Sequence, residues 1–298
     1  MLISKIGEFG LIDRFKKLIK TDASVIKGSG DDCAVIKFDR EHYLLWTCDM
    51  IVEDVYFTFR TDPYLIGRKA VAVSLSDIAA CAGEPRYLLA ALAMPKQTSL
   101  GFAEKIVQGM RETANKYRVN IVGGDLSRAG KIALDVSMLG IVKKKHLVLR
   151  SGAKPGDVIF VTGTLGGSIK GKHLKFTPRL KESRFLAENF KPSAMIDLSD
   201  GLAQDLGQIL KESRVGARIY AELIPVSPQA TGLSDALYSG EDFELLFTLP
   251  KKQAQKLLKK KLVIFQSIGE IIERRSGLRL VEKNKRETIL EPKGFRHF

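Results

Sequence analysis

Six short acidic segments stand at the ends of apolar runs and are the residues of this sequence best suited to chemistry. They are Gly30-Asp31-Asp32, Thr47-Cys48-Asp49, Ser76-Asp77, Gly123-Gly124-Asp125, Asp197-Leu198-Ser199-Asp200-Gly201 and Gly240-Glu241-Asp242. Carboxylates that converge without compensation are costly, so such a set implies bound cations or an ion-pair network. Magnesium prefers hard oxygen ligands and often shares them with substrate phosphates. The pattern therefore indicates magnesium-dependent phosphate chemistry, if the segments meet in space.

Each segment taken alone also has an ordinary structural explanation as a turn or a helix cap. The Asp197–Gly201 segment could cap a helix that begins near residue 200, and Asp77 could be a solvated position of a helix. Asp77 fits that explanation less well, because its neighbours Val73, Leu75 and Ile78 are apolar. A carboxylate in such surroundings needs a partner.

Two further features are candidates for binding phosphate. Gly123-Gly124-Asp125 follows the apolar stretch Val119–Val122, and two glycines would let the backbone approach a phosphate, although a sharp turn explains them equally well. Arg150 could clamp a phosphate, or it could be a solvated surface arginine.

Two glycine-rich stretches imitate nucleotide-binding motifs without completing them. Gly166–Lys172 matches most of a phosphate-binding loop, but His173 stands where that motif requires Ser or Thr. Gly28-Ser-Gly30 begins like a dinucleotide fingerprint and has Cys33 at the third glycine position. We expect neither stretch to bind a nucleotide in the way its motif would.

Histidine and cysteine chemistry is poorly supported by the sequence. The four histidines, His42, His146, His173 and His297, are scattered outside any catalytic motif. The three cysteines, Cys33, Cys48 and Cys81, form no CxxC pair, so neither a disulfide framework nor a zinc site is indicated. We expect Cys33 and Cys81 to be buried structural residues and the protein to work in a reducing cytoplasm.

Apolar periodicity predicts a mixed α/β protein (α/β with α+β character), and 298 residues suffice for two domains of roughly 150 residues each. Helices are expected near 4–20, 63–82, 99–118, 200–214 and 250–260. Strands are expected at 34–38, 43–48, 86–93, 132–142, 158–162, 217–221, 243–249 and 262–268. The Gly- and Pro-containing segment 150–157 marks a linker, so we expect domains at 1–145 and 146–298.

The net charge of +14 is concentrated near the C-terminus. Residues 251–298 hold 14 basic and 5 acidic side chains, a net charge of +9, which leaves +5 for the rest. A basic nucleic-acid-binding protein is therefore one alternative, although no nucleic-acid-binding motif accompanies the charge, and a solvated helical face is the simpler explanation. No apolar stretch approaches the roughly 20 residues of a membrane span, and the N-terminus is typical of an amphipathic helix rather than a secretory signal.

Nine motifs in this order resemble the thiamine-monophosphate kinase family, within the superfamily of aminoimidazole ribonucleotide synthetase and selenophosphate synthetase. The motifs are GSGDDCAVI, TCDMIVEDVYF, KAVAVSLSDIAACAGEP, IVGGDLSR, RSGAKPGD, VTGTLGGS, MIDLSDGLAQDL, SGEDFELLFTLP and PKGFRHF. The resemblance implies an N-terminal domain that dimerises through its sheet, a C-terminal α/β domain, and ATP bound beside the dimer interface. It also implies transfer of the γ-phosphoryl group of ATP to thiamine monophosphate, with obligatory magnesium.

The resemblance assigns roles residue by residue. It implies a metal site of Asp32, Thr47, Cys48, Asp49, Asp77, Asp125, Asp197 and Asp200, in which Thr47 and Cys48 contribute backbone oxygens. It implies that ATP contacts Gly124, Asp125, Arg150 and Ser199. Glu241 would face the cationic thiamine, with Phe295 as its aromatic cover, and the family positions for substrate contacts are occupied here by Tyr56 and Pro292.

Three departures from the family pattern stand in this chain: Tyr56 in place of the usual His, Pro292 in place of a common Trp, and Cys48 in place of the usual Thr. No catalytic base is expected, because a phosphomonoester is mostly dianionic at pH 7 and the obstacle is repulsion between phosphates. Another ATP-dependent synthetase of the superfamily is the enzymatic alternative, although Cys33 does not lie in the glycine-rich setting that a selenophosphate synthetase would need.

Overall fold

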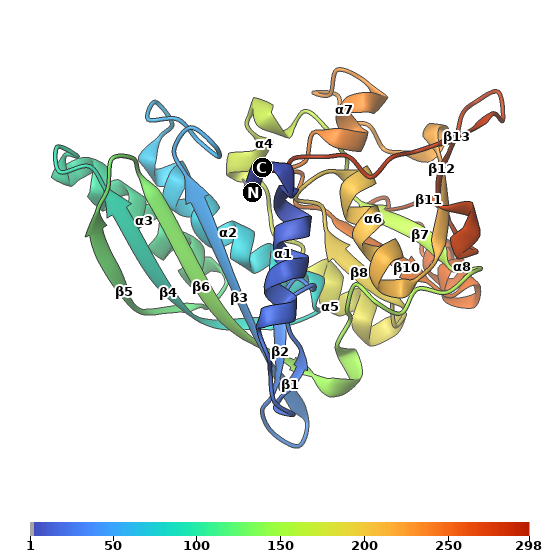
Figure 1. Cartoon of the computed structure of the whole chain (residues 1–298), viewed down its shortest axis with the longest axis horizontal. Coiled ribbons are helices and arrows are strands. Elements are labelled where there is room, and N and C mark those ends of the chain that lie inside the picture. The colour runs from blue at the N-terminus through green and yellow to red at the C-terminus, as the bar shows by residue number, and fades with distance from the viewer. Residues whose placement is uncertain (1–2, 298) are drawn as a thin grey trace.

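The computed structural model describes residues 3–297, apart from the side chain of Phe9, and contains two sheets that lie side by side with helices between and around them (Figure 1). Phe298, the last residue of the terminal motif, lies outside the described residues, as do residues 1 and 2. Short 3-10 helices occur at Ile3–Lys5, Lys144–His146, Ser168–Lys170, Ala221–Leu223 and Arg274–Ser276. Within residues 3–297, no helix is long and apolar enough to cross a membrane.

The first sheet has six strands and one well-buried face. Its strands pair antiparallel except for the last two, which are parallel. In spatial order they are β1 (Val25–Lys27), β2 (Ala34–Lys37), β3 (His42–Val52), β6 (Ala133–Lys143), β4 (Glu84–Met94) and β5 (Asn120–Arg128). Every second residue of β6 is buried, as period-2 alternation requires of a sheet covered on one face.

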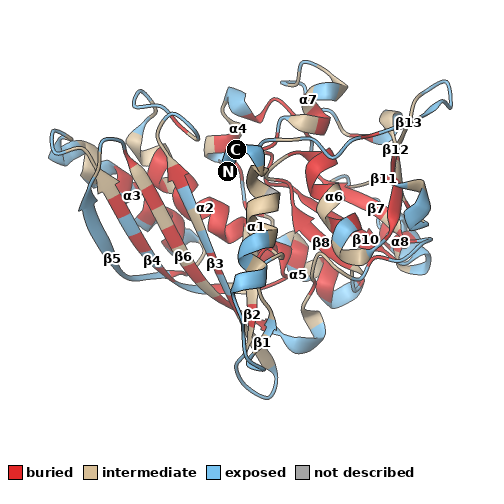
Figure 2. Ribbon diagram, in the orientation of Figure 1, coloured by how far each residue is buried: buried red, intermediate tan, exposed pale blue. Residues whose placement is uncertain are grey.

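Helix α2 (Pro63–Ala80) lies between the two halves of the molecule and is buried along most of its length (Figure 2). Asp62 caps its N-terminus by accepting the Tyr64 N–H, and Pro63 occupies the first turn, where its missing N–H costs nothing. The helix contacts β3 and β6 on one side and β8 (Ala194–Asp197) on the other. Residues of α2 can therefore face both halves at once.

Helix α3 (Leu100–Lys116) packs against α2 on the buried face of the first sheet, next to β5. The two helices touch at glycines: a Cβ added to Gly67 would lie 1.9 Å from the carbonyl oxygen of Ile106. Both helices lie on the same face, so the opposite face of the sheet has no covering helix in the described residues, and β5 is exposed at every position (Figure 2).

The second sheet has seven strands and is covered on both faces. In spatial order they are β13 (Glu287–Ile289), β12 (Leu278–Val281), β9 (Gly216–Tyr220), β11 (Phe265–Ile272), β7 (Val158–Thr162), β10 (Leu245–Leu249) and β8. One core contains α6 (Leu202–Ser213) and α7 (Leu233–Tyr238), and the other contains α5 (Leu180–Asn189) and α8 (Lys251–Lys259). Two-sided burial explains why β8 and β10 are buried at every residue.

Helix α1 (Gly7–Leu18) and the C-terminal segment meet beside the gap between the two halves (Figure 1). The His297 N–H donates to Glu8 Oε2 at 3.0 Å, and the Phe295 N–H donates to the Asp200 carbonyl oxygen at 3.0 Å. The C-terminal segment therefore returns from the second half to the first.

The predicted α/β class is confirmed, and the five predicted helices are present with ends that differ by a few residues. Of the two explanations offered for Gly123-Gly124-Asp125, the sharp turn is wrong, because β5 continues through these residues to Arg128. The elements that the sequence analysis missed include β8, β12, β13, α4 (Lys172–Lys175), α5 and α7. The expected domain boundary at residue 145 stays a prediction.

Candidate active site

A cavity of about 730 Å³ opens between the two halves and is lined by α1, β3, α2, the loop after β8, the loop before β10 and the C-terminal segment. Most residues that the sequence analysis predicted as site residues line it. They are Asp32, Thr47, Cys48, Asp49, Tyr56, Asp77, Arg150, Asp197, Ser199, Asp200, Glu241 and Phe295.

Three carboxylates form the centre of this cavity. Oxygens of Asp32, Asp77 and Asp197 lie within 4.8 Å of one another, although the residues come from the loop before β2, from α2 and from the end of β8. Thr47 donates a hydrogen bond to Asp77, and Ser76 donates one to Asp197 at 2.6 Å. Asp77 therefore has the polar partner that was expected for a carboxylate in apolar surroundings. The spacing of the three carboxylates is suited to a cation.

The pKa values of Asp197, Asp77 and Asp49 are raised, chiefly because these carboxyl groups are buried beside other carboxylates. Burial and the neighbouring Asp32 raise the pKa of Asp197 to about 8, and burial with the charge of Asp49 raises that of Asp77 well above its usual range. Burial also raises the pKa of Asp49, whose Oδ2 atom has no hydrogen-bond partner. A buried carboxylate oxygen without a partner is costly, so this site is incomplete by itself.

Arg150 contributes the one guanidinium among the described residues that line the cavity. Its Nη2 and Nε atoms donate to the two oxygens of Asp32 at 2.9 and 3.3 Å, and its backbone N–H donates to Asp31. The alternative of a solvated surface arginine is therefore wrong. Asp31 is an additional lining residue, and burial together with the charge of Asp32 raises its pKa to about 7.

The loop after β8 is organised by a carboxylate that the sequence analysis did not single out. Asp205, in the first turn of α6, accepts the N–H groups of Asp200 and Gly201, both at 3.1 Å. Asp205 thus binds the two N–H groups just before α6, while the carboxylate of Asp200 lines the cavity. Burial and the charge of Glu8 raise the pKa of Asp200 to about 6.

Several aromatic side chains lie together at one end of the cavity. The Tyr56 hydroxyl lies 2.9 Å from His297 Nε2, and the rings of Phe295 and His297 lie with their centroids 6.3 and 5.7 Å from that of Tyr56. Glu8, which accepts the His297 N–H, also lines the cavity. His297 and Glu8 were missed because no local motif marks either of them.

Glu241 faces the same end of the cavity and is paired with a buried lysine. Lys69, a fully buried residue of α2, forms an ion pair with Glu241 and donates to the Tyr56 carbonyl oxygen at 3.1 Å. Lys69 was missed, yet a signal existed, since it interrupts an apolar helix just as Asp77 does.

Three predicted site residues are not brought to the cavity by this chain. Gly124 and Asp125 lie on β5 and line a separate hollow of about 290 Å³ on the uncovered sheet face. Gly124 allows close strand pairing, because a Cβ there would lie 1.7 Å from the Ala90 carbonyl oxygen. Pro292 instead packs against α6, where a Cβ added to Gly207 would lie 2.7 Å from it.

Cys48 is divided between the cavity and the uncovered sheet face. It lines the cavity, but its thiol donates to Asp135 Oδ1 at 2.9 Å on that face, which leaves its backbone for any role in the cavity. Burial, the hydrogen bond to Asp135 and the nearby charges raise the pKa of the Cys48 thiol to about 12. Cys33 and Cys81 are buried, as expected.

The chain matches two family models, "AIR synthase related protein, N-terminal domain" over residues 30–142 and "AIR synthase related protein, C-terminal domain" over residues 154–281. It is 37% identical to the thiamine-monophosphate kinase of Buchnera aphidicola subsp. Schizaphis graminum, across 98% of this chain and 99% of that protein. The Bacillus subtilis thiamine-monophosphate kinase is 32% identical across 98% and 99%. The solved structure "AaThiL complexed with AMPPCP and TMP" is similar with a TM-score of 0.87 and 30% identity, covering 100% of this chain and 99% of that one.

Proposed function

Because the chain belongs to the thiamine-monophosphate kinase family, we propose that it transfers the γ-phosphoryl group of ATP to thiamine monophosphate. The products are thiamine diphosphate and ADP. One observation carries the proposal: carboxylates from both halves of the molecule converge in a single cavity that lacks enough positive charge to balance them. Full-length similarity to a structure that holds AMPPCP and TMP supports the choice of donor and acceptor.

Magnesium fits the residues of this cavity. Hard carboxylate oxygens are the ligands that it prefers, and the partnerless Oδ2 atom of Asp49 is an orphaned acceptor suited to a cation. We expect that Asp32, Asp49, Asp77, Asp197 and Asp200 would hold the metal, with Thr47 beside them. When bound, magnesium would supply positive charge to offset repulsion between the donor and acceptor phosphates.

The protein's own residues bind and orient, and none has to remove a proton. A phosphate monoester is already mostly dianionic at neutral pH, so the acceptor oxygen is nucleophilic without a base. Arg150 and Ser199 line the acidic part of the cavity, where they would contact the phosphates of ATP. Arg150 must then exchange part of its pairing with Asp32 for a phosphate, which its planar guanidinium can do without losing charge.

The part of the cavity that Tyr56 and Phe295 line suits the thiamine portion of the acceptor. Tyr56 and Phe295 offer aromatic surface there, to which a cationic heterocycle is attracted. Glu241 adds a carboxylate, although its pairing with Lys69 offsets part of its charge. Pro292 lies against α6 instead, so we assign it no substrate contact.

We infer that two copies pair through the uncovered face of the first sheet. Trp46, Met50 and Leu89 are about half exposed on that face, at 46%, 56% and 48%, which is unusual for large apolar side chains that stand together. Such pairing would bury Gly124 and Asp125 in an interface, where they could reach a nucleotide bound beside it. Sedimentation analysis that gave a monomer at micromolar concentration would contradict the dimer.

The test is a coupled product assay. The purified protein is incubated with ATP, magnesium chloride and thiamine monophosphate, and thiamine diphosphate and ADP are quantified together, with chelator and acceptor-free controls. Equimolar, magnesium-dependent products are expected. ADP without thiamine diphosphate would indicate a different phosphate acceptor, as used by another enzyme of the same superfamily. The absence of both products would contradict the proposal.

A further inference from the structure

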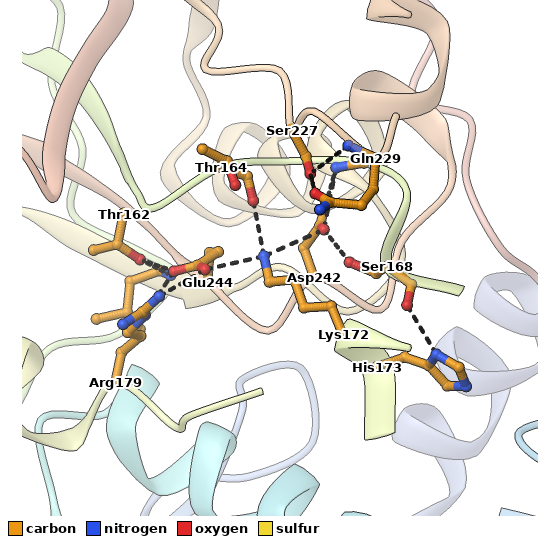
Figure 3. Close-up of polar contacts among 12 residues, drawn as sticks. Thr162, Thr164, Ser168, Lys172, His173, Arg179, Ser227, Gln229, Asp242 and Glu244 are labelled. Atoms are coloured by element: carbon orange, nitrogen blue, oxygen red, sulfur yellow. Dashed lines mark hydrogen bonds and ion pairs between the residues drawn. The ribbon is translucent and has the colours of Figure 1, made fainter. Parts of the chain in front are cut away.

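The glycine-rich segment Gly166–Lys172, which imitates a phosphate-binding loop, is held in place by a group of polar side chains (Figure 3). We call this group the Lys172 network; it consists of Thr162, Ser168, Lys172, Arg179, Asp242 and Glu244. Lys172 Nζ lies 2.8 Å from the Thr164 carbonyl oxygen, 3.0 Å from Glu244 Oε1 and 3.5 Å from Asp242 Oδ1. The lysine that a phosphate-binding loop would direct at a nucleotide is thus engaged by two carboxylates.

The two carboxylates of the network are buried and fully partnered. Asp242 accepts the Gly166 N–H at 2.9 Å and the Ser168 hydroxyl, while Glu244 accepts the Thr162 hydroxyl at 2.7 Å. Arg179 pairs with both oxygens of Glu244, at 2.6 and 2.8 Å. In the part of the chain that the structure describes, Lys172 is the cation that joins both carboxylates to the loop.

The segment that carries these carboxylates also forms a wall of the cavity. Asp242 and Glu244 alternate with Glu241 and Phe243, which line the cavity. Glu241 and Phe243 have φ angles of +55° and +50°, a region that residues other than glycine rarely adopt unless their surroundings hold them there. The network is therefore placed to hold this backbone.

The glycine-rich loop that precedes Lys172 in the chain also reaches the cavity. Ile169, between Ser168 and Lys170, lines it, and the Ser168 hydroxyl is bound to Asp242. One network thus connects the three cavity residues Ile169, Glu241 and Phe243. Asp32 and Arg150 belong to segments outside the network. The Glu241 N–H, however, donates to the Ser199 carbonyl oxygen at 2.7 Å, so the held segment also adjoins Ser199.

We propose that Lys172 is a positioning residue for the acceptor end of the cavity: by joining Asp242 and Glu244 to the glycine-rich loop, it sets where Glu241, Phe243 and Ile169 stand. The inference rests on the proposed function, which places thiamine monophosphate at that end. Small displacements of orienting groups weaken binding at the place they line, so the larger effect is expected on the acceptor. The effect on ATP is smaller, because Arg150 lies outside the network.

The test compares Lys172→Met with Lys170→Met. Lys170 is an exposed lysine of the same loop whose Nζ donates to the Gln229 carbonyl oxygen outside the network, so it is the matched control. Lys172→Met is expected to raise KM for thiamine monophosphate about tenfold and to leave KM for ATP within about twofold. Lys170→Met is expected to change neither. Equal increases in both KM values, or an unchanged KM for thiamine monophosphate, would overturn the positioning role.

Removal of Lys172 leaves two buried carboxylates with one cation, so the single variant could fold poorly. The double variant Lys172→Met/Asp242→Asn removes one charge of each sign, and the same separation of KM values is expected from it. Wild-type protein that forms no thiamine diphosphate would contradict the proposed function and this inference together. Active wild-type protein with a normal double variant would contradict the positioning role alone.

Discussion

The cavity and the Lys172 network are both acidic and buried, and they differ in the source of the positive charge that balances their carboxylates. In the network, Asp242 and Glu244 are matched by Lys172 and Arg179 from the same chain. Among the described residues that line the cavity, eight carboxylate side chains surround the single guanidinium of Arg150. Burial and neighbouring carboxylates raise the pKa values of Asp197 and Asp77, and Asp49 retains a partnerless oxygen.

The difference teaches that burial alone does not identify a ligand site. A buried carboxylate that is paired with cations of the same chain stabilises the fold only while those partners remain. A buried carboxylate without such partners carries an electrostatic cost that a bound ligand can remove. The contrast between the two clusters can be tested by changing one residue of each.

The largest effect on activity is expected from Asp77→Asn, which removes the charge of a central carboxylate of the cavity and keeps the shape of the side chain. Turnover should fall by about a thousandfold or more, because positioning and charge compensation are the main contributions to phosphoryl transfer. Thermal unfolding should stay close to that of the wild type. Asp125→Asn should have the same consequence if the uncovered sheet face pairs two copies; near-normal rates in either variant would refute its assignment to the metal site.

Substitutions in the Lys172 network, in contrast to Asp77→Asn, should lower the stability of the protein. Arg179→Met leaves Glu244 buried without its bidentate partner, and the free energy of unfolding should fall by about 3–5 kcal/mol. The double variant Arg179→Met/Glu244→Gln should lose less than the single one, because the uncompensated charge is gone. Chemical denaturation measures both, and a double variant less stable than Arg179→Met would contradict this account.

A smaller effect is expected from pH on the metal-free protein. The pKa values of Asp200, Asp31 and Asp197 are raised to about 6, 7 and 8, so the folded state holds protons that the unfolded chain releases near pH 4. Stability should therefore fall as pH rises from about 4 to 8. Magnesium should reverse the trend and release protons at pH 7, which thermal melts and a weakly buffered titration would detect. A stability that rises across this range would contradict the charge deficit.

The smallest effect is expected from Tyr56→Phe, which keeps the ring and removes the hydroxyl that meets His297 Nε2 at 2.9 Å. A hydrogen bond of this kind contributes about 1 kcal/mol, so KM for thiamine monophosphate should rise about fivefold or less. KM for ATP should not change. A loss of turnover comparable to that of Asp77→Asn would place Tyr56 in the chemical step instead.

Local patterns predicted much of the fold because they depend on neighbouring residues. The apolar spacing of α2 and the alternation of β6 each follow from a regular period that burial imposes. Prediction failed where the surroundings decide. A sharp turn was one of two explanations for Gly123-Gly124-Asp125, but these residues lie inside β5. Gly124 there is so close to Ala90 of the partner strand that no side chain would fit. Strand β8 was missed because its motif was interpreted as a loop and a cap.

The sequence by itself determined which side chains could do chemistry: acidic residues at the ends of apolar runs, without a base among them. Only the tertiary structure decided which charges are paired. The Lys69–Glu241 pair joins residues 172 positions apart, and the Tyr56–His297 contact joins residues 241 apart. Tertiary structure also decided that the Asp205 carboxylate binds the N–H groups of Asp200 and Gly201. Charge compensation depends on distance in space, which no local period of the chain encodes.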